Sequence, residues 1–84
     1  MSAKPKAPTK LPDRENLREI LAYNIQLLRV KKGWSQERLA NECELDRTYV
    51  SAVERCRWNI SLSNIEKLAI ALNTGAWELL KLPE

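Results

Sequence analysis

The stretch LDRTYVS (residues 45–51) sets an arginine, a threonine and a tyrosine side by side after an aspartate. Asp46 is a favourable residue to precede a helix, so Arg47, Thr48 and Tyr49 are predicted to form the opening turn of one. A cation is unfavourable there, because the start of a helix carries partial positive charge. We therefore expect a partner outside the helix to compensate for Arg47. Arginine can pair with two acceptor atoms at once, and the hydroxyl groups can donate or accept a hydrogen bond.

Two short helices are predicted to position this turn. They span Gln36–Cys43 and Arg47–Arg55, and only residues 44–46 join them. Such a short connection forces the steep crossing of a helix-turn-helix. Ala40 supplies the small residue that is needed where the two helices approach each other. The apolar residues expected to face the core from this unit are Leu39, Leu45, Val50 and Val53.

In this arrangement the opening turn of the second helix points at base edges in the major groove of double-stranded DNA. Arg47 is predicted to bond to the O6 and N7 atoms of guanine. Thr48 and Tyr49 are predicted to meet a thymine methyl group or a phosphate, and Ser51, one turn further on, a base or the backbone. The alternative is that this turn is only a solvated helix start.

The rest of the chain predicts an all-α fold of five helices. Leu17, Leu21, Ile25 and Leu28 recur at helical spacing after Asp13, the predicted cap of the first helix. Gly33 is predicted to end that helix. No segment alternates with a period of two, so we expect no sheet.

A fourth helix is predicted to begin at Ser61 or Ser63, where SNIE fits a capping box, and AWELLKL predicts a short fifth helix. Residues 1–12 lack periodicity and are rich in lysine and proline, which predicts a disordered basic tail. That tail is either an inert extension or an arm that lies along DNA. Residues 13–84 are predicted to form a single DNA-binding and dimerisation domain.

Composition excludes several classes of protein. The 84 residues carry a net charge of +3 and contain no histidine and only two cysteines, Cys43 and Cys56. A four-ligand zinc site is therefore excluded, and buried or half-buried free thiols are expected. The sequence has no strained serine turn and no phosphate-binding glycine loop. We expect no enzyme activity, no catalytic residues, no metal and no cofactor.

No apolar run approaches the roughly eighteen residues of a membrane span, and no apolar stretch follows the N-terminal lysines. A cytoplasmic protein of a bacterium or phage, without membrane contact, is the expectation.

The segment SQERLANECELDRTYVSAVER resembles the helix-turn-helix of lambda-repressor-like, Xre-type transcriptional regulators. LDRTYVS, followed by VER and NISL, is most similar to the controller proteins of restriction–modification systems. The resemblance covers residues 20–82. It implies a compact domain that regulates transcription, as repressor, activator or both, by binding palindromic operators.

The same resemblance implies roles for individual residues. Arg47, Thr48 and Tyr49 match the base-contacting turn, and Arg29 and Glu54 match a buried structural salt bridge. The residues expected to contact DNA phosphates are Gln36, Arg55, Arg57 and Asn59.

Two positions depart from the family pattern. Relatives usually have glycine where this chain has Glu44 and Cys56. A left-handed conformation would cost Glu44 about 1 kcal/mol or more, so we expect the turn to relax and the loop at Cys56 to differ. Trp58 is expected either to pack against the domain or to contact sugar–phosphate or a partner.

A homodimer is expected, because one small domain contacts few base pairs and paired recognition helices lie one turn apart, about 34 Å. The residues predicted to form the dimer interface are Ala76, Trp77, Leu79, Leu80 and Leu82. Alternatively, Trp77 and Leu80 only close the core.

Two further alternatives stay open. An antitoxin would bind a toxin as well as its own promoter. A regulator of this type can also contact RNA polymerase, through acids such as Glu42 or Glu44. No pocket for a small-molecule ligand is evident.

Overall fold

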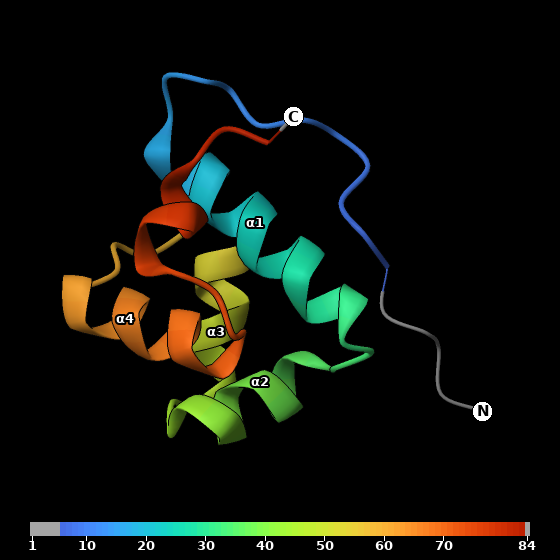
Figure 1. Cartoon of the computed structure of the whole chain (residues 1–84), viewed down its shortest axis with the longest axis vertical. Coiled ribbons are helices and arrows are strands. Elements are labelled where there is room, and N and C mark those ends of the chain that lie inside the picture. The colour runs from blue at the N-terminus through green and yellow to red at the C-terminus, as the bar shows by residue number, and fades with distance from the viewer. Residues whose placement is uncertain (1–5, 84) are drawn as a thin grey trace.

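The computed structural model describes residues 6–83, which form four α-helices and a terminal 3₁₀-helix (Figure 1). The elements are α1 (Leu17–Lys31), α2 (Gln36–Cys43), α3 (Arg47–Glu54), α4 (Leu62–Ala71) and the 3₁₀-helix η1 (Ala76–Leu80). Residues 6–83 contain no strand, so the all-α prediction is confirmed for them. The predicted fifth helix is the 3₁₀-helix, a form that is common in such short pieces. None of the helices in this part of the chain combines the length and apolarity needed to cross a membrane.

Side-chain caps explain where α2, α3 and α4 begin. Ser35, Asp46 and Ser61 each accept a hydrogen bond from a backbone N–H of the first turn that follows. Each cap satisfies a donor that the helix itself cannot satisfy. Ser35 and Asp46 are the predicted caps. Ser61 is one of the two predicted starts of α4, and the capping box predicted at Ser63 is wrong.

The predicted cap of α1 is also wrong, because Asn16 takes that role instead of Asp13. The Asn16 Oδ1 atom accepts from the Glu19 backbone N–H at 3.2 Å, and its Nδ2 donates to the Glu19 carboxylate at 3.0 Å. Asp13 accepts from the Glu15 backbone N–H at 2.9 Å, in a turn ahead of the helix. Asn16 satisfies two groups at once with Glu19, which favours the later start.

The core lies where α1, α2, α3, α4 and η1 converge. Ala40 is 1% exposed and allows the close approach of α2 and α3, as predicted. Leu17 is 63% exposed and therefore lies outside the apolar stripe of α1 to which its spacing assigned it. The largest fully buried side chains are those of Leu21, Ile25, Leu39, Val50, Leu68 and Leu79.

A buried asparagine attaches the end of the chain to α1. The Asn24 amide Nδ2 donates to the carbonyl oxygens of Leu79 and Lys81, each at 2.8 Å, and lies 3.4 Å from that of Glu78. A 3₁₀-helix this short leaves carbonyls without partners inside it, and Asn24 satisfies them. The position of η1 on the fold is therefore set by a single side chain as well as by packing.

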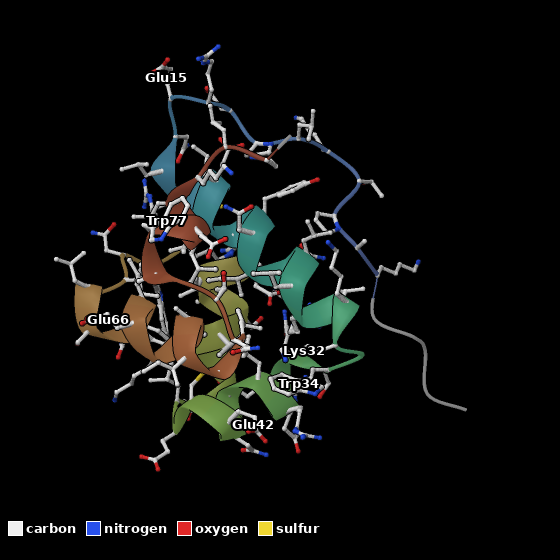
Figure 2. All side chains as sticks on the ribbon, viewed as in Figure 1. Glu15, Lys32, Trp34, Glu42, Glu66 and Trp77 are labelled. Atoms are coloured by element: carbon white, nitrogen blue, oxygen red, sulfur yellow. The ribbon has the colours of Figure 1, made fainter. Side chains whose placement is uncertain are left out.

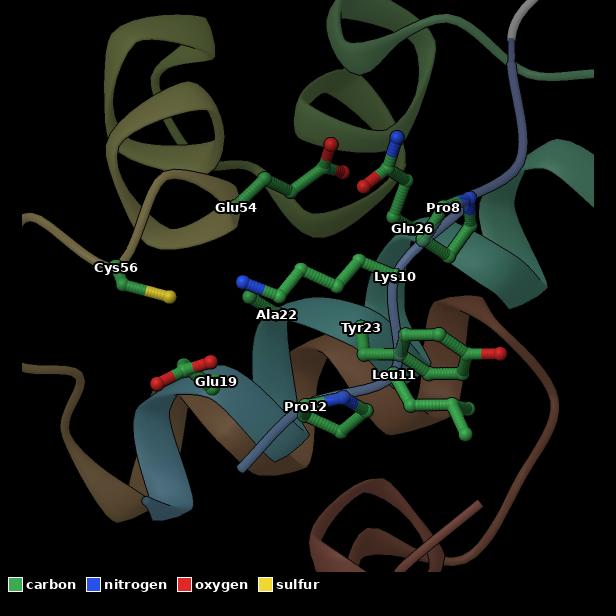
Figure 3. Close-up of a pocket in the computed structure, with 10 residues that line it drawn as sticks. All are labelled: Pro8, Lys10, Leu11, Pro12, Glu19, Ala22, Tyr23, Gln26, Glu54 and Cys56. Atoms are coloured by element: carbon green, nitrogen blue, oxygen red, sulfur yellow. The ribbon is translucent and has the colours of Figure 1, made fainter. Parts of the chain in front are cut away.

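The segment before α1 runs back along that helix (Figure 1). The Gln26 Nε2 atom donates to the Lys6 carbonyl at 3.0 Å, and Pro8 and Pro12 are partly buried. A hollow of about 150 Å³ lies between this segment, α1 and Cys56 (Figure 3). Residues 1–5 of the predicted disordered tail lie outside the described residues. Residues 6–12 have no helix but do contact the domain.

Candidate nucleic-acid interface

The turn between α2 and α3 does not relax as expected. Glu44 adopts the left-handed conformation, with φ 57° and ψ 37°. The Leu45 N–H bonds to the Ala40 carbonyl at 2.9 Å and the Glu44 N–H to the Asn41 carbonyl at 3.3 Å. These two bonds end α2 in a Schellman motif, which requires a left-handed residue at this position. The turn keeps its geometry at the expense of local strain at Glu44, and the expectation of a relaxed turn is wrong.

The opening turn of α3 presents two exposed side chains, those of Arg47 and Thr48. The Asp46 carboxylate accepts from the Thr48 backbone N–H at 2.7 Å and so fixes the start of the helix. Among residues 6–83, Arg47 forms no ion pair or hydrogen bond through its side chain. An arginine that opposes the helix dipole thus lacks an internal partner, and its five donors are free for an external one.

Tyr49 and Ser51 are only partly accessible. The Tyr49 ring packs against the core, and its centroid lies 5.9 Å from that of Trp58, with the two planes tilted by 54°. Its hydroxyl oxygen accepts from Asn64 Nδ2 at 3.0 Å. The sequence did not indicate Asn64, because no local pattern places the start of α4 against α3.

Glu54 joins α1, α2 and α3 through one carboxylate. Arg29 donates to it from Nε at 2.7 Å and from Nη2 at 2.9 Å, and the side chains of the pair are 7% and 4% exposed. This is the buried salt bridge that the resemblance implies. Gln36 Nε2 also donates to Glu54, at 3.1 Å. The second hydrogen of that amide remains available for a phosphate, the contact predicted for Gln36.

The loop after α3 exposes the other predicted phosphate contacts, Arg55, Arg57 and Asn59. Cys56 is left-handed, with φ 59°, and the Arg57 N–H bonds to the Ala52 carbonyl at 2.9 Å. The backbone of Cys56 therefore has the conformation that glycine would favour, and the loop difference expected at this position is not seen in it. Trp58 packs against Tyr49 and is 48% exposed, so part of this residue remains accessible to solvent.

The two thiols are free. Cys43 is buried and Cys56 is half-buried, as expected. Burial raises the pKa of the Cys43 thiol to about 11, and the neighbouring Glu42 carboxylate adds to that shift. Burial likewise raises the pKa of Cys56. No group of three potential metal ligands occurs among the described residues.

The predicted dimer surface is partly wrong, because Leu79 is 0% exposed and belongs to the core of the single chain. Trp77 and Leu82 are 68% and 39% exposed, and Ala76 and Leu80 are half-buried. Figure 2 labels Trp77 on η1 and Glu66 on α4, which both line a hollow of about 300 Å³. The exposed Leu62 and Leu17 extend this apolar surface, and no sequence pattern indicated this role for them.

Two short helices joined by a tight left-handed turn, with free polar side chains at the start of the second, define a helix-turn-helix protein. A family model described as helix-turn-helix matches residues 25–76, and the chain belongs to that family.

Its relatives include transcription factors and controller proteins. A hypothetical transcription factor from Neisseria meningitidis is 65% identical over 77 residues, 92% of this chain and 73% of that protein. Its counterpart among solved structures, from Neisseria, superposes with a TM-score of 0.93 at 64% identity, covering 95% of this chain and 92% of that one.

The control protein C.BamHI of Bacillus amyloliquefaciens is 44% identical over 66 residues, 77% of this chain and 82% of that protein. The restriction–modification controller protein C.Esp1396I, solved as a tetramer with its natural 35-base-pair operator, is 33% identical with a TM-score of 0.69. That match covers 76% of this chain and 88% of that one.

Proposed function

We propose that this chain is a sequence-specific DNA-binding regulator of transcription that acts as a homodimer on palindromic operators. The observation that carries the proposal is that the side chain of Arg47, at the start of α3 beside Thr48, is exposed and has no partner among residues 6–83. Family membership supports it, as do the structures of C.Esp1396I with operator DNA. Repression and activation are both compatible with such binding, because the outcome depends on where the operator lies.

Direct readout comes from α3. Arg47 pairs with guanine O6 and N7, Thr48 and Tyr49 contact a thymine methyl or a phosphate, and Ser51 approaches a base or the backbone. Phosphate contacts fix the register of the protein on the duplex without reading its sequence. The residues that make them in this proposal are Gln36, Arg55, Arg57 and Asn59.

The second protomer docks on the apolar surface formed by α4 and η1. Trp77 and Leu62 are 68% and 77% exposed there, and Leu80 lines the hollow between them. Two-fold pairing of this surface with itself would cover these side chains and set two α3 helices about 34 Å apart on one face of the duplex. Ala76 and Leu82 border it.

The proposal includes no enzymatic activity and assigns the protein to the bacterial cytoplasm. A contact with RNA polymerase through Glu42 and Glu44 would suit an activator. Both carboxylates are exposed, although Glu42 already pairs with Arg38 at 2.9 Å.

Selection of bound duplexes from a random pool tests the proposal. The purified protein is incubated with random double-stranded DNA at physiological salt, and the retained duplexes are sequenced after several rounds. We expect a palindrome whose half-sites lie about one helical turn apart. A pool that stays random through selection at both low and physiological salt would refute sequence-specific binding.

A further inference from the structure

Asn64 lies in the first turn of α4 and reaches across to the recognition helix. Its Nδ2 donates to the Tyr49 hydroxyl at 3.0 Å in a partly buried position. Its own backbone N–H is held by the Ser61 hydroxyl at 3.2 Å, so the residue sits in a capped and ordered helix start. The hydrogen bond therefore links a fixed point on α4 to a side chain predicted to touch DNA.

The direction of this bond determines what Tyr49 can offer to a partner. An amide nitrogen only donates, so the Tyr49 oxygen is the acceptor and keeps its own proton. The hydroxyl makes no other hydrogen bond within residues 6–83. The Tyr49 proton must therefore point away from Asn64. Because the hydroxyl oxygen already accepts the bond from Asn64, its own O–H becomes a stronger donor.

The ring has little freedom to carry the hydroxyl elsewhere. Tyr49 is half-buried against the core, and Trp58 lies beside it at 5.9 Å between centroids. The ring is thus held by the core and by Trp58, and the hydroxyl oxygen is held by Asn64. Preorganisation of this kind lowers the entropy lost on binding.

We infer that Asn64 is a positioning residue for DNA recognition, which acts by committing the Tyr49 hydroxyl as a donor. The inference rests on the proposed function and deepens it. Tyr49 then bonds to an acceptor on the DNA, which is a phosphate oxygen or a base acceptor such as N7 or O4. It discriminates against the amino groups of adenine and cytosine, which are donors.

A double-mutant cycle tests this role, with the duplex selected by the wild-type protein as the probe. Fluorescence anisotropy gives the affinities of the wild type, Asn64→Ala, Tyr49→Phe and the double variant. We expect each single change to weaken binding about three- to tenfold, and the double variant to bind like Tyr49→Phe alone. A purely structural role for Asn64 would give the same loss in both backgrounds and would overturn the inference.

Asn64→Asp sharpens the test because a carboxylate can only accept, so the Tyr49 O–H would donate its hydrogen bond to that carboxylate instead of to DNA. Its affinity should fall further than that of Asn64→Ala when Tyr49 is present. In the Tyr49→Phe background the remaining loss measures the added negative charge alone. An equal loss from Asn64→Asp in both backgrounds would contradict proton direction as the mechanism.

Ser63→Ala is the matched control, because Ser63 lies in the same turn and touches the Ser61 hydroxyl at 3.2 Å. We expect it to change affinity less than twofold, and a loss as large as that of Asn64→Ala would overturn the specific role of Asn64. If the wild type itself selects no sequence, the proposed function fails together with this inference. If the wild type selects a site and the cycle is additive, only the role of Asn64 fails.

Discussion

At the scale of single residues, the recognition turn contains two kinds of side chain. Arg47 and Thr48 are exposed, and among residues 6–83 neither forms a hydrogen bond or an ion pair through its side chain. In the proposed complex, DNA would order them. Tyr49 is already held by Asn64 and Trp58. Arg47 should therefore lose more conformational entropy on binding than Tyr49, and a bidentate bond to guanine can offset that loss.

Replacing Arg47 by alanine tests its assignment as a base contact. We expect a loss of about 1–3 kcal/mol on the selected duplex and relaxed preference at one base pair of each half-site. Competition binding with the selected duplex and with random DNA measures both effects. Lys67→Ala is the control, because it removes the same charge from α4, beside Glu42. Equal losses on selected and random DNA would contradict base readout by Arg47.

The Cys43 thiol predicts a pH effect on stability. Because burial raises its pKa from 9.0 to about 11, the unfolded chain loses this proton before the folded one. The contribution of the protonated thiol is complete below pH 9 and disappears as the pH rises to about 11. The destabilisation caused by Cys43→Ala, measured by denaturant unfolding, should therefore be smaller at about pH 10.5 than at pH 8. A difference that is independent of pH would exclude this linkage.

The candidate site could be predicted from the sequence only where its residues are neighbours in the chain. Arg47 and Thr48 follow the cap Asp46, and that local order was enough to predict an exposed opening turn. The bond from Asn64 to Tyr49 and the bond from Gln36 to Glu54 each join two different helices, across 15 and 18 residues of sequence. No periodicity carries that information, because it arises only when the helices pack.

At the scale of elements, all four α-helices end in the same way. Each is followed by a left-handed residue whose neighbour bonds back to the last turn, a Schellman motif. These left-handed residues are Gly33, Glu44, Cys56 and Asn73. Of these four residues, only Gly33 adopts the left-handed conformation without a steric penalty. At the other three positions the chain keeps the same turn without the usual glycine.

Glu44→Gly should therefore stabilise the domain. The left-handed φ of 57° costs glycine nothing, and the gain should be about 0.5–1 kcal/mol after the larger entropy of the unfolded chain is subtracted. Equilibrium unfolding in urea measures it. Glu44→Ala keeps the Cβ atom and removes the charge, so it should give no such gain. A similar gain in both variants would assign the effect to charge rather than to backbone strain.

The Arg29–Glu54 pair makes the packing of α1 on α3 depend on two charges. Glu54→Ala leaves the Arg29 guanidinium buried, with the Trp34 carbonyl as its remaining partner among residues 6–83, and should cost about 3–5 kcal/mol. Replacing both residues by apolar ones, Arg29→Met with Glu54→Leu, should restore most of that loss. Thermal and urea unfolding of the two variants compare them. If the double variant is no more stable than Glu54→Ala, the buried and unpaired charge of Arg29 is not the cause of the loss.

Element boundaries show what local sequence can determine. The start of α2 at Ser35 and of α3 at Asp46 was predictable, because a single strong cap precedes each. The start of α1 was not, since Asp13 and Asn16 both offer an oxygen and only the bonds with Glu19 decide between them. The attachment of η1 to α1 was not predictable either, because Asn24, which donates to the Leu79 carbonyl, lies more than fifty residues earlier.

At the scale of the whole molecule, α4 and η1 leave an apolar surface exposed on the single chain. Leu17, Leu62 and Trp77 are 63%, 77% and 68% exposed, and they line two neighbouring hollows of about 270 and 300 Å³. Contiguous exposed apolar surface of this kind marks an interaction site in a small protein. The sequence predicted the contribution of η1 but not that of Leu62, because its place outside the core is set by how α4 packs.

A charge placed on this surface should abolish dimerisation while the folding of each protomer and its own contact with DNA are kept. Leu62→Glu leaves the core unchanged, since the side chain is already exposed, but would bury a carboxylate in the interface, where it is repelled by its two-fold copy. We expect sedimentation velocity to report a monomer. Binding to the selected palindrome should weaken strongly, whereas binding to a single half-site should stay unchanged.

Ile70→Glu is the matched control, because Ile70 is 79% exposed on the same helix yet lines a different hollow, beside Glu42 and Lys67. If Leu62→Glu stays dimeric while Ile70→Glu dissociates, the two-fold contact lies on the other face of α4, and η1 only closes the core.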